Sequence, residues 1–447
     1  MPEPGAGSAP WVRKPHNWER LFCVWACPPW YWTGPVGRGY PSTSDTAVEP
    51  SRNARLYIAR SIPAHTPQAQ PPVGKAQRDC FMNTPWPWLE QQRGVSRFGF
   101  VRRDGTGLLG AGIAEQVSGT SIGEVLEQVQ ARGGTWFVGG CFDPGAERAP
   151  WWSPFGTASA WRPHTLVSLP GQALPAASAP APHRPPPEPP AHGPHPDRAA
   201  WERMVEAADD SIARGQIEKV VLARSISEPA ATDALSWLAG PSGKRDMAFL
   251  FEPRPGLAFA GLTPELLFER MGAEVQSEAL AGTNANTEEG RARLMASDKD
   301  AREHALVVEA VHASLQPLCD QLKKTPLKLA PAGKLVHRLV SFRGALRAGV
   351  GDAQLASALH PTPAVAGTPA DAALSFLRTH EPFDRGWYAG PVGIVEPHRT
   401  TLAVALRCGL WGGDTRVAYA GAGLVAGSRA QAEWDETEAK SLAVRGR

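Results

Sequence analysis

The segment "EWDETEAK", which begins at Glu433, places several charged side chains within about two helical turns. On a helix, positions three, four and seven apart share a face, so Glu433, Glu436 and Lys440 form one stripe while Asp435 and Glu438 point elsewhere. Such a stripe is typical of a solvated surface, where Glu436 and Lys440 form an ordinary i, i+4 pair. Two carboxylates on one face are also suited to a divalent metal ion.

A glycine-rich stretch, "AYAGAGLVAGSRAQA", comes immediately before this segment. Ser428 is followed three residues later by Gln431, which predicts a capping box and a helix beginning at Ser428. Glycines such as Gly421 and Gly423 let backbone N–H groups approach an anion closely, and a helix start favours negative charge. We therefore expect a carboxylate-binding loop beside the charged stripe.

A further carboxylate belongs to the segment "SDKDAREHALVVEAVHASLQPL", which reads as a helix with Ser297 as its N-cap. Along this helix Glu303 shares a face with Val307, Ala310 and Val311, so it points toward the apolar side. Because burial of an unpaired charge costs several kcal/mol, we expect a metal ion or another cation next to Glu303.

Two more charged residues lie where predicted strands begin. Lys219 opens the β-branched run of "IEKVVLARSI" and shares a strand face with Val221 and Ala223. An ordinary interpretation is a lysine whose stem crosses apolar surface at a strand end. Glu265 follows Pro264 at the entry to the apolar strand "LLFER", a position that also suits an exposed strand end.

Composition limits the class of protein. The chain has 447 residues, enough for two or three domains or one large α/β unit, and 46 basic against 44 acidic residues give a net charge of +2. This balance gives no support to binding of nucleic acid or a membrane surface. The six cysteines lack paired CxxC spacing and no apolar run is long enough to span a bilayer, so we expect reduced thiols and a cytoplasmic protein.

The chain divides into four predicted parts. Residues 1–81 are rich in Trp, Pro, Arg and Ser without periodicity, which favours a disordered arm or an upstream extension that is not normally translated, with Met82 as an alternative start. Residues 82–169 are strand-like, and residues 170–197 form a proline-rich linker or surface crossing. Residues 198–447 alternate helix and strand patterns and carry the charged motifs.

The motifs resemble, in order, the signatures of the chorismate-utilising enzymes, and among these most resemble isochorismate synthases. The resemblance covers residues 84–447. It implies an α+β fold like that of anthranilate synthase component I, with two large stacked antiparallel sheets flanked by helices and an active site in a deep central cleft. The motifs that carry it are "KVVLAR", "GLTPELLFER", "LAGT", "SDKDAREHALVV", "HPTPAVAGTP", "EPFDRGWYAGPVG" and "GAGLVAGSRAQAEWDETEAK".

The resemblance implies a magnesium ion that bridges a carboxylate of chorismate to glutamates of two helices. The matching residues are Glu303 and Glu436, with Glu433 as a supporting ligand that often acts through water. It also implies that backbone N–H groups bind a substrate carboxylate with a lysine near the same anionic end, that a tyrosine and an arginine bind the enolpyruvyl carboxylate, and that four further residues face the substrate. Gly421, Ala422 and Gly423 match the backbone N–H groups, and Lys440 matches the lysine. Tyr388 and Arg407 match the tyrosine and the arginine. The four further residues that face the substrate are Gly282, Thr283, His337 and Ala364.

The resemblance further implies the reaction. Enzymes that make aminodeoxychorismate have a lysine where this chain has Ala281, and anthranilate synthases lack the lysine that matches Lys219, so water is the expected nucleophile. Lys219 would remove a proton from water attacking C2 of chorismate. Glu265, on the opposite face, would protonate the departing C4 hydroxyl. The product is isochorismate, formed reversibly, by a monomer without a glutamine amidotransferase subunit.

Alternatives remain open at this point. Salicylate synthases share these motifs and then eliminate pyruvate from isochorismate, but they typically have a threonine at the position of Ala364. A non-catalytic relative that binds chorismate would have no physical need for the inward charges. Asn284 stands where the family commonly has an arginine. The use of the product, for menaquinone, a catechol siderophore or salicylate, depends on neighbouring enzymes.

Overall fold

The structure, a computed structural model, describes part of the chain in detail. The extension predicted for residues 1–81 and the alternative start at Met82 lie outside the described residues, as does most of the predicted linker at 170–197. The described residues are 86–170, 175–176, 188–189, 194–240, 243 and 245–446.

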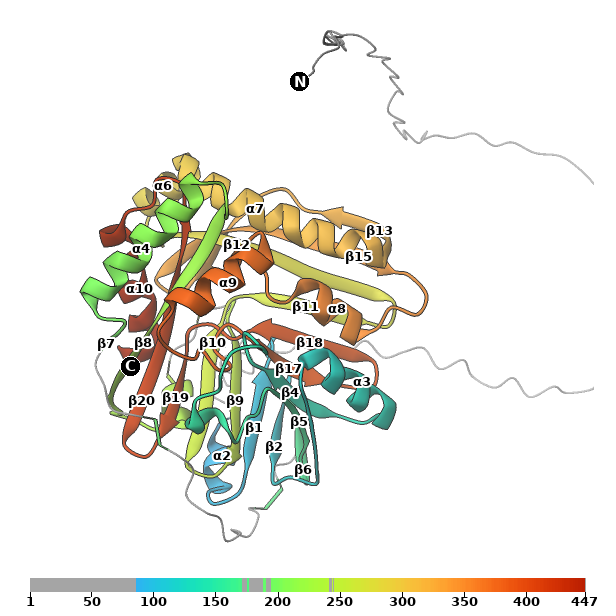
Figure 1. Cartoon of the computed structure of the whole chain (residues 1–447). Coiled ribbons are helices and arrows are strands. Elements are labelled where there is room, and N and C mark those ends of the chain that lie inside the picture. Colours follow the sequence, from blue (N-terminus) through green and yellow to red (C-terminus); the bar gives the residue numbers. More distant parts are fainter. Residues whose placement is uncertain are drawn as a thin grey trace, which may run out of the picture. The chain divides into compact units, whose positions relative to one another are not determined.

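The described strands form two sheets of ten strands each, and every pairing is antiparallel (Figure 1). Sheet A runs in the order β16 (Gly367–Thr368), β8 (Lys219–Pro229), β20 (Thr415–Val425), β19 (Cys408–Gly412), β10 (Leu257–Thr263), β9 (Met247–Arg254), β1 (Arg97–Val101), β2 (Gly107–Ala111) and β6 (Thr165–Leu169), with β7 (Pro194–His195) also paired to β8. Sheet B runs in the order β13 (Cys319–Lys324), β15 (Leu335–Leu346), β12 (Glu274–Ala285), β11 (Leu266–Met271), β18 (Arg399–Val404), β17 (Pro391–Val395), β4 (Trp136–Gly140), β5 (Ala158–Arg162) and β3 (Glu115–Gly119), with β14 (Lys328–Ala332) also paired to β15.

Helices flank the sheets (Figure 1). Among them α4 and α10 pack over β8 and β20 of sheet A, whereas α6 and α7 lie along β12 of sheet B. The described helices are α2 (Pro87–Gln91), α3 (Ile122–Arg132), α4 (Arg198–Ala213), α5 (Ala234–Leu238), α6 (Glu288–Ala296), α7 (Asp298–Leu315), α8 (Asp352–Leu359), α9 (Ala370–His380) and α10 (Ala430–Arg445).

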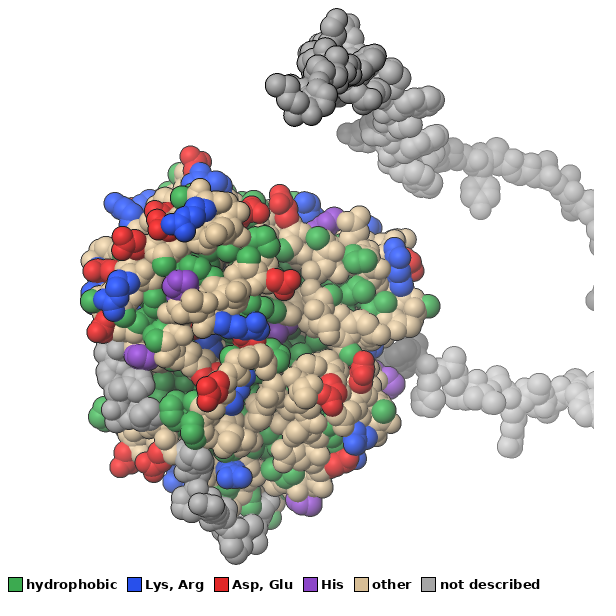
Figure 2. Space-filling model, viewed as in Figure 1, with side chains coloured by type: hydrophobic (Ala, Val, Ile, Leu, Met, Phe, Trp, Pro, Cys, Tyr) green, Lys and Arg blue, Asp and Glu red, His purple; other side chains and the backbone are tan. Residues whose placement is uncertain are grey.

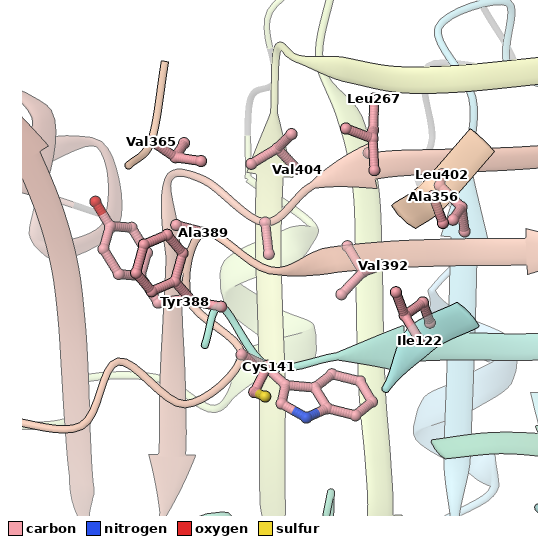
Figure 3. Close-up of a cluster of buried hydrophobic side chains, with 14 of the residues drawn as sticks. Ile122, Cys141, Leu267, Ala356, Val365, Tyr388, Ala389, Val392, Leu402 and Val404 are labelled. Carbon is pink, nitrogen blue, oxygen red and sulfur yellow. The ribbon is translucent and has the colours of Figure 1, made fainter. Parts of the chain in front are cut away.

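The main core lies between the two sheets. The ring of Phe98 on β1 stacks on those of Phe137 on β4 and Trp161 on β5, with centroids 5.6 and 5.3 Å apart. Trp161 also lies 5.8 Å from Trp387, so large aromatic rings from both sheets fill one apolar layer. Figure 3 shows another part of the main core, around Val392 and Val404. The predicted α+β fold, with two stacked antiparallel sheets flanked by helices, is confirmed.

Residues 82–169 share both sheets with the rest of the chain, because β1, β2 and β6 belong to sheet A and β3, β4 and β5 to sheet B. The strand-like prediction for this segment is wrong at α3. The Ser121 hydroxyl accepts a hydrogen bond from the Glu124 N–H and caps this helix. Its apolar positions recur at helical spacing and are buried: Ile122, Val125, Leu126 and Val129.

The glycine-rich stretch before α10 differs from its prediction in two ways. Gly421 and Gly423 lie inside strand β20, not in a loop. The helix begins at Ala430, with Arg429 as an N-cap that has no side-chain cap bond, so the capping box predicted at Ser428 is wrong. The Ser428 hydroxyl instead accepts the Val425 N–H, at 3.2 Å, and closes the turn that connects β20 to α10.

The surface and the cysteines agree with the composition. Basic and acidic side chains are interspersed over the face seen in Figure 2, as expected from the small net charge. Cys141, Cys319 and Cys408 are buried free thiols. In the part of the chain that the structure describes, no helix combines the length and apolarity that a bilayer crossing requires.

Candidate active site

A cavity lies where β8, β20 and β12 approach α7 and α10, and most of the predicted site residues line it. The predicted residues at its wall are Glu265, Gly282, Thr283, Glu303, His337, Ala364, Tyr388, Arg407, Gly421, Gly423, Glu436 and Lys440. The other lining residues are not among the predicted substrate contacts: Val221, Pro264, Leu280, Ala281, Val365, Leu406, Tyr419 and Ala420. Three predicted residues, Lys219, Ala422 and Glu433, are not at the wall.

Lys219 lies directly behind the wall. It is fully buried at the start of β8, and its Nζ is 3.0 Å from Oε1 of Glu303 on α7. A Cβ atom at Gly423 would collide with the Glu303 carboxylate and lie 3.1 Å from Lys219 Cε, so only glycine leaves room for this ion pair. Burial alone would raise the pKa of Glu303, but the Lys219 and Lys299 ammonium groups hold that pKa below its usual value.

The pKa of Glu265, unlike that of Glu303, is raised above its usual value. Its side chain is buried immediately before β11, and this burial raises its pKa to about 8, although the Lys219 charge opposes part of the rise. The Thr263 hydroxyl accepts the Glu265 N–H at 3.3 Å, which fixes the backbone at this point. Glu265 is therefore mainly a neutral carboxylic acid at neutral pH and can give a proton to a group in the cavity.

The carboxylates of α10 are held by lysines. Oε1 of Glu433 accepts from Lys299 Nζ at 2.6 Å, and Oε1 of Glu436 accepts from Lys440 Nζ at 2.7 Å. The predicted stripe of Glu433, Glu436 and Lys440 thus faces inward, with Glu433 only 1 % exposed. Lys299 is not among the predicted site residues, although it lies four residues before Glu303 on α7 and such spacing places both on one face.

These carboxylates fit an oxygen-seeking divalent cation. Burial raises the pKa of Glu433 and the nearby Glu436 charge raises it further, while the buried Glu433 Oε2 has no hydrogen-bond partner. Within the described ranges, no three acidic, histidine or cysteine side chains are grouped closely enough to hold a metal by themselves. Because Mg²⁺ usually keeps several waters and takes only one or two carboxylates plus ligand oxygens, water and a substrate carboxylate would complete the set.

Arg407 and His337 form the cationic end of the cavity. Arg407 Nη2 donates to His337 Nε2 at 2.6 Å, and His337 Nδ1 lies 3.2 Å from the Gly282 carbonyl oxygen and 3.1 Å from Thr283 Oγ1. Burial and the neighbouring Arg407 charge hold the pKa of His337 well below its usual value. His337 is therefore a neutral acceptor that orients the guanidinium. The φ of Arg407 is 46°, a left-handed conformation uncommon outside glycine and frequent at functional sites.

The backbone of β20 presents N–H groups to the cavity. Val221 and Ala223 on β8 donate their N–H groups away from β20, to the Ala366 carbonyl and the Glu381 carboxylate. In an antiparallel ladder their register partners, Gly423 and Gly421, likewise direct their backbone groups away from β8. These two N–H groups therefore point to the cavity side.

Ala422 does not share this direction, because it alternates with its glycine neighbours and pairs with Leu222. Only the flanking glycines are at the wall. Lys440 Nζ donates to the Gly421 carbonyl oxygen at 2.8 Å, so the ammonium of α10 is held at the same end of the cavity as these N–H groups. An anionic group there would meet both a lysine and two backbone donors.

Two stacked tyrosines complete the wall. The rings of Tyr388 and Tyr419 are 5.3 Å apart with an interplanar angle of 13°, and burial raises the pKa of both, so both are neutral hydrogen-bond donors. A Cβ at Gly421 would be 2.9 Å from the Tyr388 hydroxyl, so the absence of a side chain leaves that hydroxyl room. Figure 3 shows this hydroxyl pointing away from Cys141 and Val392.

A profile of the family described as "Chorismate binding enzyme" matches residues 171–445. The chain belongs to the chorismate-binding enzyme family. Among curated members, it is 36% identical over 260 residues to "Isochorismate synthase, chloroplastic" of Catharanthus roseus, and 34% identical over 263 residues to isochorismate synthase MenF of Escherichia coli (strain K12). It is 39% identical over 267 residues to isochorismate synthase DhbC of Bacillus subtilis (strain 168).

The matched region covers 55%, 56% and 55% of this chain but 45%, 60% and 67% of those relatives, so the chain spans about half to two thirds of their length. Solved chorismate-binding structures align more completely. The 2,3-dihydroxybenzoate-specific isochorismate synthase DhbC of Bacillus anthracis superposes with a TM-score of 0.67 at 27% identity, over 80% of this chain and 98% of that one. MenF of Escherichia coli superposes with a TM-score of 0.66 at 27% identity, over 81% and 90%.

Proposed function

We propose that this chorismate-binding enzyme is an isochorismate synthase that converts chorismate reversibly to isochorismate with Mg²⁺. The observation that carries the proposal is the pairing, around one cavity, of a buried neutral acid, Glu265, with a buried lysine, Lys219, which is joined to Glu303. A reaction that moves a hydroxyl group across a ring needs a proton acceptor and a proton donor. The names of the three curated relatives given above support the same reaction.

Binding follows from the cationic and hydrogen-bonding groups that line the cavity. Chorismate is a dianion with a ring carboxylate and an enolpyruvyl carboxylate. In the proposal Arg407 and the Tyr388 hydroxyl bind the enolpyruvyl carboxylate, because a guanidinium can bind a carboxylate through two parallel hydrogen bonds. The ring carboxylate accepts hydrogen bonds from the N–H groups of Gly421 and Gly423, and the Lys440 ammonium lies beside these donors.

The hydroxyl shift then needs two proton transfers. Lys219 is an ammonium while it pairs with Glu303, so it must first release a proton to solvent. As a neutral amine it then accepts a proton from a water molecule while the oxygen of that water bonds to C2. Glu265 gives its proton to the C4 hydroxyl, which leaves as water. Each of the two ring double bonds shifts by one position as C2 gains the new oxygen and C4 loses the old one. One water enters and one leaves, so the product is an isomer, and exchange of protons with solvent restores the amine and the acid.

The metal site is part of the same proposal. Glu303 and Glu436 would hold Mg²⁺ together with a substrate carboxylate, and Glu433 would act through water. When bound, the ion offsets negative charge on the ring carboxylate as the double bonds shift. The neighbouring lysines, Lys299 and Lys440, stabilise these carboxylates before the ion binds.

Two residues, Ala281 and Lys219, support water as the nucleophile. Ala281 lines the cavity as a methyl group, so no lysine amine is available there for covalent catalysis. Lys219 could act as a base toward water, which favours water over ammonia, so we propose a reaction without a glutamine amidotransferase subunit. We also propose that the enzyme is a monomer. The buried free thiols of Cys141, Cys319 and Cys408 support a reducing compartment such as the cytoplasm.

The test is to incubate the purified chain with chorismate in the presence of either Mg²⁺ or EDTA and to resolve the products by liquid chromatography and mass spectrometry. Isochorismate in equilibrium with chorismate, formed only with metal, is the expected result. Salicylate with an equal amount of pyruvate would show a lyase instead. The absence of any product with metal present would overturn the proposal in favour of a chorismate-binding protein without activity.

A further inference from the structure

A buried ion pair lies behind the cavity wall and outside the proposed chemistry. Glu381 follows the last residue of α9, and Arg385 comes four residues later, with both side chains only 4% exposed. The pair is bidentate, with Nε 2.5 Å from Oε1 and Nη2 2.7 Å from Oε2. The guanidinium carbon also lies 4.2 Å from the centroid of the Phe142 ring. Neither Glu381 nor Arg385 lines the cavity.

The same guanidinium binds the backbone of two separate wall segments. Arg385 Nη2 donates to the Val221 carbonyl oxygen on β8 at 2.6 Å, and Nη1 donates to the Val365 carbonyl oxygen at 2.9 Å. The Glu381 carboxylate accepts the Ala223 N–H at 3.3 Å, again on β8. Val221 and Val365 both line the cavity, so the ion pair joins two of its walls from behind.

The connection reaches the reacting groups over short distances. Val221 lies two residues after Lys219 on the same face of β8, and Val365 is adjacent to Ala364 at the wall. The Val221 N–H also donates to the Ala366 carbonyl oxygen at 2.8 Å, so the strand and the loop are tied by a direct bond as well as through Arg385. A change in the spacing of these segments would move Lys219 relative to a bound ring.

Arginine is the residue that this arrangement requires. It presents five N–H donors in a rigid planar fork, which here bind one carboxylate and two carbonyl groups at once. Lysine has three donors on a single nitrogen atom and cannot reach acceptors that are spread around the edge of a guanidinium plane. Loss of the guanidinium would leave two buried carbonyl oxygens and the Glu381 carboxylate without this partner.

We propose that Arg385, oriented by Glu381, is a positioning residue that sets the spacing between β8 and the Ala364–Val365 loop and thereby aligns Lys219 with the substrate. Its catalytic consequence rests on the proposed isochorismate synthase function, whereas the clamp itself does not. The displacement of a reacting group by about 1 Å costs on the order of 100-fold in rate. The expected loss is therefore in kcat rather than in KM, since Arg385 does not touch the cavity.

The experiment compares Arg385→Lys and Arg385→Ala with Arg378→Ala as a matched control. Arg378 makes an equally bidentate pair with Asp143, at 2.7 and 2.7 Å, but it is half exposed and none of its described hydrogen bonds reaches the cavity wall. Hydrogen exchange is measured at the Val221 and Ala223 amides. We expect exchange about tenfold faster or more in both Arg385 variants and unchanged in the control, because these amides bond to the segments that the clamp holds.

Turnover gives the second readout. We expect kcat to fall by about 10- to 100-fold in the Arg385 variants with KM changed less than about threefold, and ethylguanidinium to restore part of the kcat of Arg385→Ala where ethylammonium does not.

If the Ala variant does not fold, Arg385→Lys decides the question. Wild-type exchange rates in a folded Lys variant would overturn the clamp, and faster exchange with wild-type kcat would overturn the positioning role. A wild-type chain that makes no isochorismate would overturn the proposed function, while the exchange rates would still decide on the clamp.

Discussion

Lys219 Nζ lies 3.0 Å from Glu303 Oε1, so a residue at the start of β8 and a residue on the buried face of α7 share one charge pair at the cavity wall. In the proposed mechanism one partner moves a proton and the other holds a metal ion. The pair therefore keeps both groups inside the protein without an unpaired charge while the cavity has no substrate.

The first prediction concerns Lys219. Lys219→Met retains the apolar stem but removes the amine, and we expect kcat to fall by about 10²- to 10⁴-fold, the range for loss of a general base. Binding of chorismate with Mg²⁺, measured by calorimetry, should persist because the ligand-binding groups remain. Lys328→Met, at an exposed lysine of β14, is the control and should leave kcat unchanged. Unchanged turnover in folded Lys219→Met would show that the base is a different residue.

The second prediction follows from the acid Glu265, whose pKa is raised to about 8 by burial. The proposed donor must be protonated, so the ionisation of Glu265 should not affect kcat/KM at lower pH. Above about pH 8 this ionisation should lower kcat/KM about tenfold per pH unit. Glu265→Gln should lower kcat/KM strongly and remove this alkaline limb from the residual activity. An alkaline limb that persists in Glu265→Gln would assign the limb to another group.

Local sequence patterns were sufficient to predict the start of α7 and the direction of the site residue that it carries. Ser297 caps α7 as predicted, accepting the Asp300 N–H at 3.1 Å, and Glu303 follows on the apolar face of the same helix, buried with Val307 and Val311. These features depend only on helical spacing. The motifs that carry the resemblance then supplied the remaining site residues, and the family to which they point is confirmed.

Patterns failed where the environment depends on distant segments. Glycines of "AGAG" favour a loop by composition, yet Gly421 and Gly423 lie in a central strand, because the Tyr388 hydroxyl and the Glu303 carboxylate occupy the space of their missing side chains. Arg385 bonds to Val221 across more than 160 positions of sequence, and no local periodicity encodes such a contact. The sequence of α3, by contrast, carried a helical apolar stripe that was readable but overlooked.

The third prediction concerns the metal. Glu436→Gln should weaken Mg²⁺ binding in calorimetry and reduce the thermal stabilisation that Mg²⁺ gives, which for a specific site amounts to about 2.7 kcal/mol at 100 times the dissociation constant. Glu438→Gln is the matched control, because Glu438 lies on the same helix but pairs with Arg224 at 2.8 Å, outside the cavity lining. Equal Mg²⁺ affinities for the two variants would contradict the assignment of Glu436 as a ligand.

The fourth prediction concerns the cationic end. Arg407→Lys retains the charge but removes the planar fork, and we expect KM for chorismate to rise by about 10- to 100-fold, the equivalent of one lost hydrogen bond to a charged group. His337→Phe should cause a similar increase by freeing the guanidinium that Nε2 now orients at 2.6 Å. Steady-state kinetics of the double variant provide the check. If the two residues act as one unit, their effects will be less than additive.

The last prediction concerns the choice of product. Ala364 lies half-buried at the cavity wall, beside Val365, whose carbonyl oxygen Arg385 holds. Salicylate synthases resemble this chain but typically have threonine here, so Ala364→Thr should increase the ratio of pyruvate to isochorismate. Pyruvate is measured with lactate dehydrogenase and isochorismate by chromatography.

The size of this change is limited by the chemistry of a single methyl and hydroxyl group. Differences of this scale in a pocket amount to about 1–3 kcal/mol, so the product ratio should change by about 10- to 200-fold and not switch completely. Ala370→Thr, at an exposed position that begins α9, provides the control and should leave the ratio unchanged. A ratio in Ala364→Thr equal to that of this control would mean that the width of the cavity at this wall does not decide whether pyruvate is eliminated.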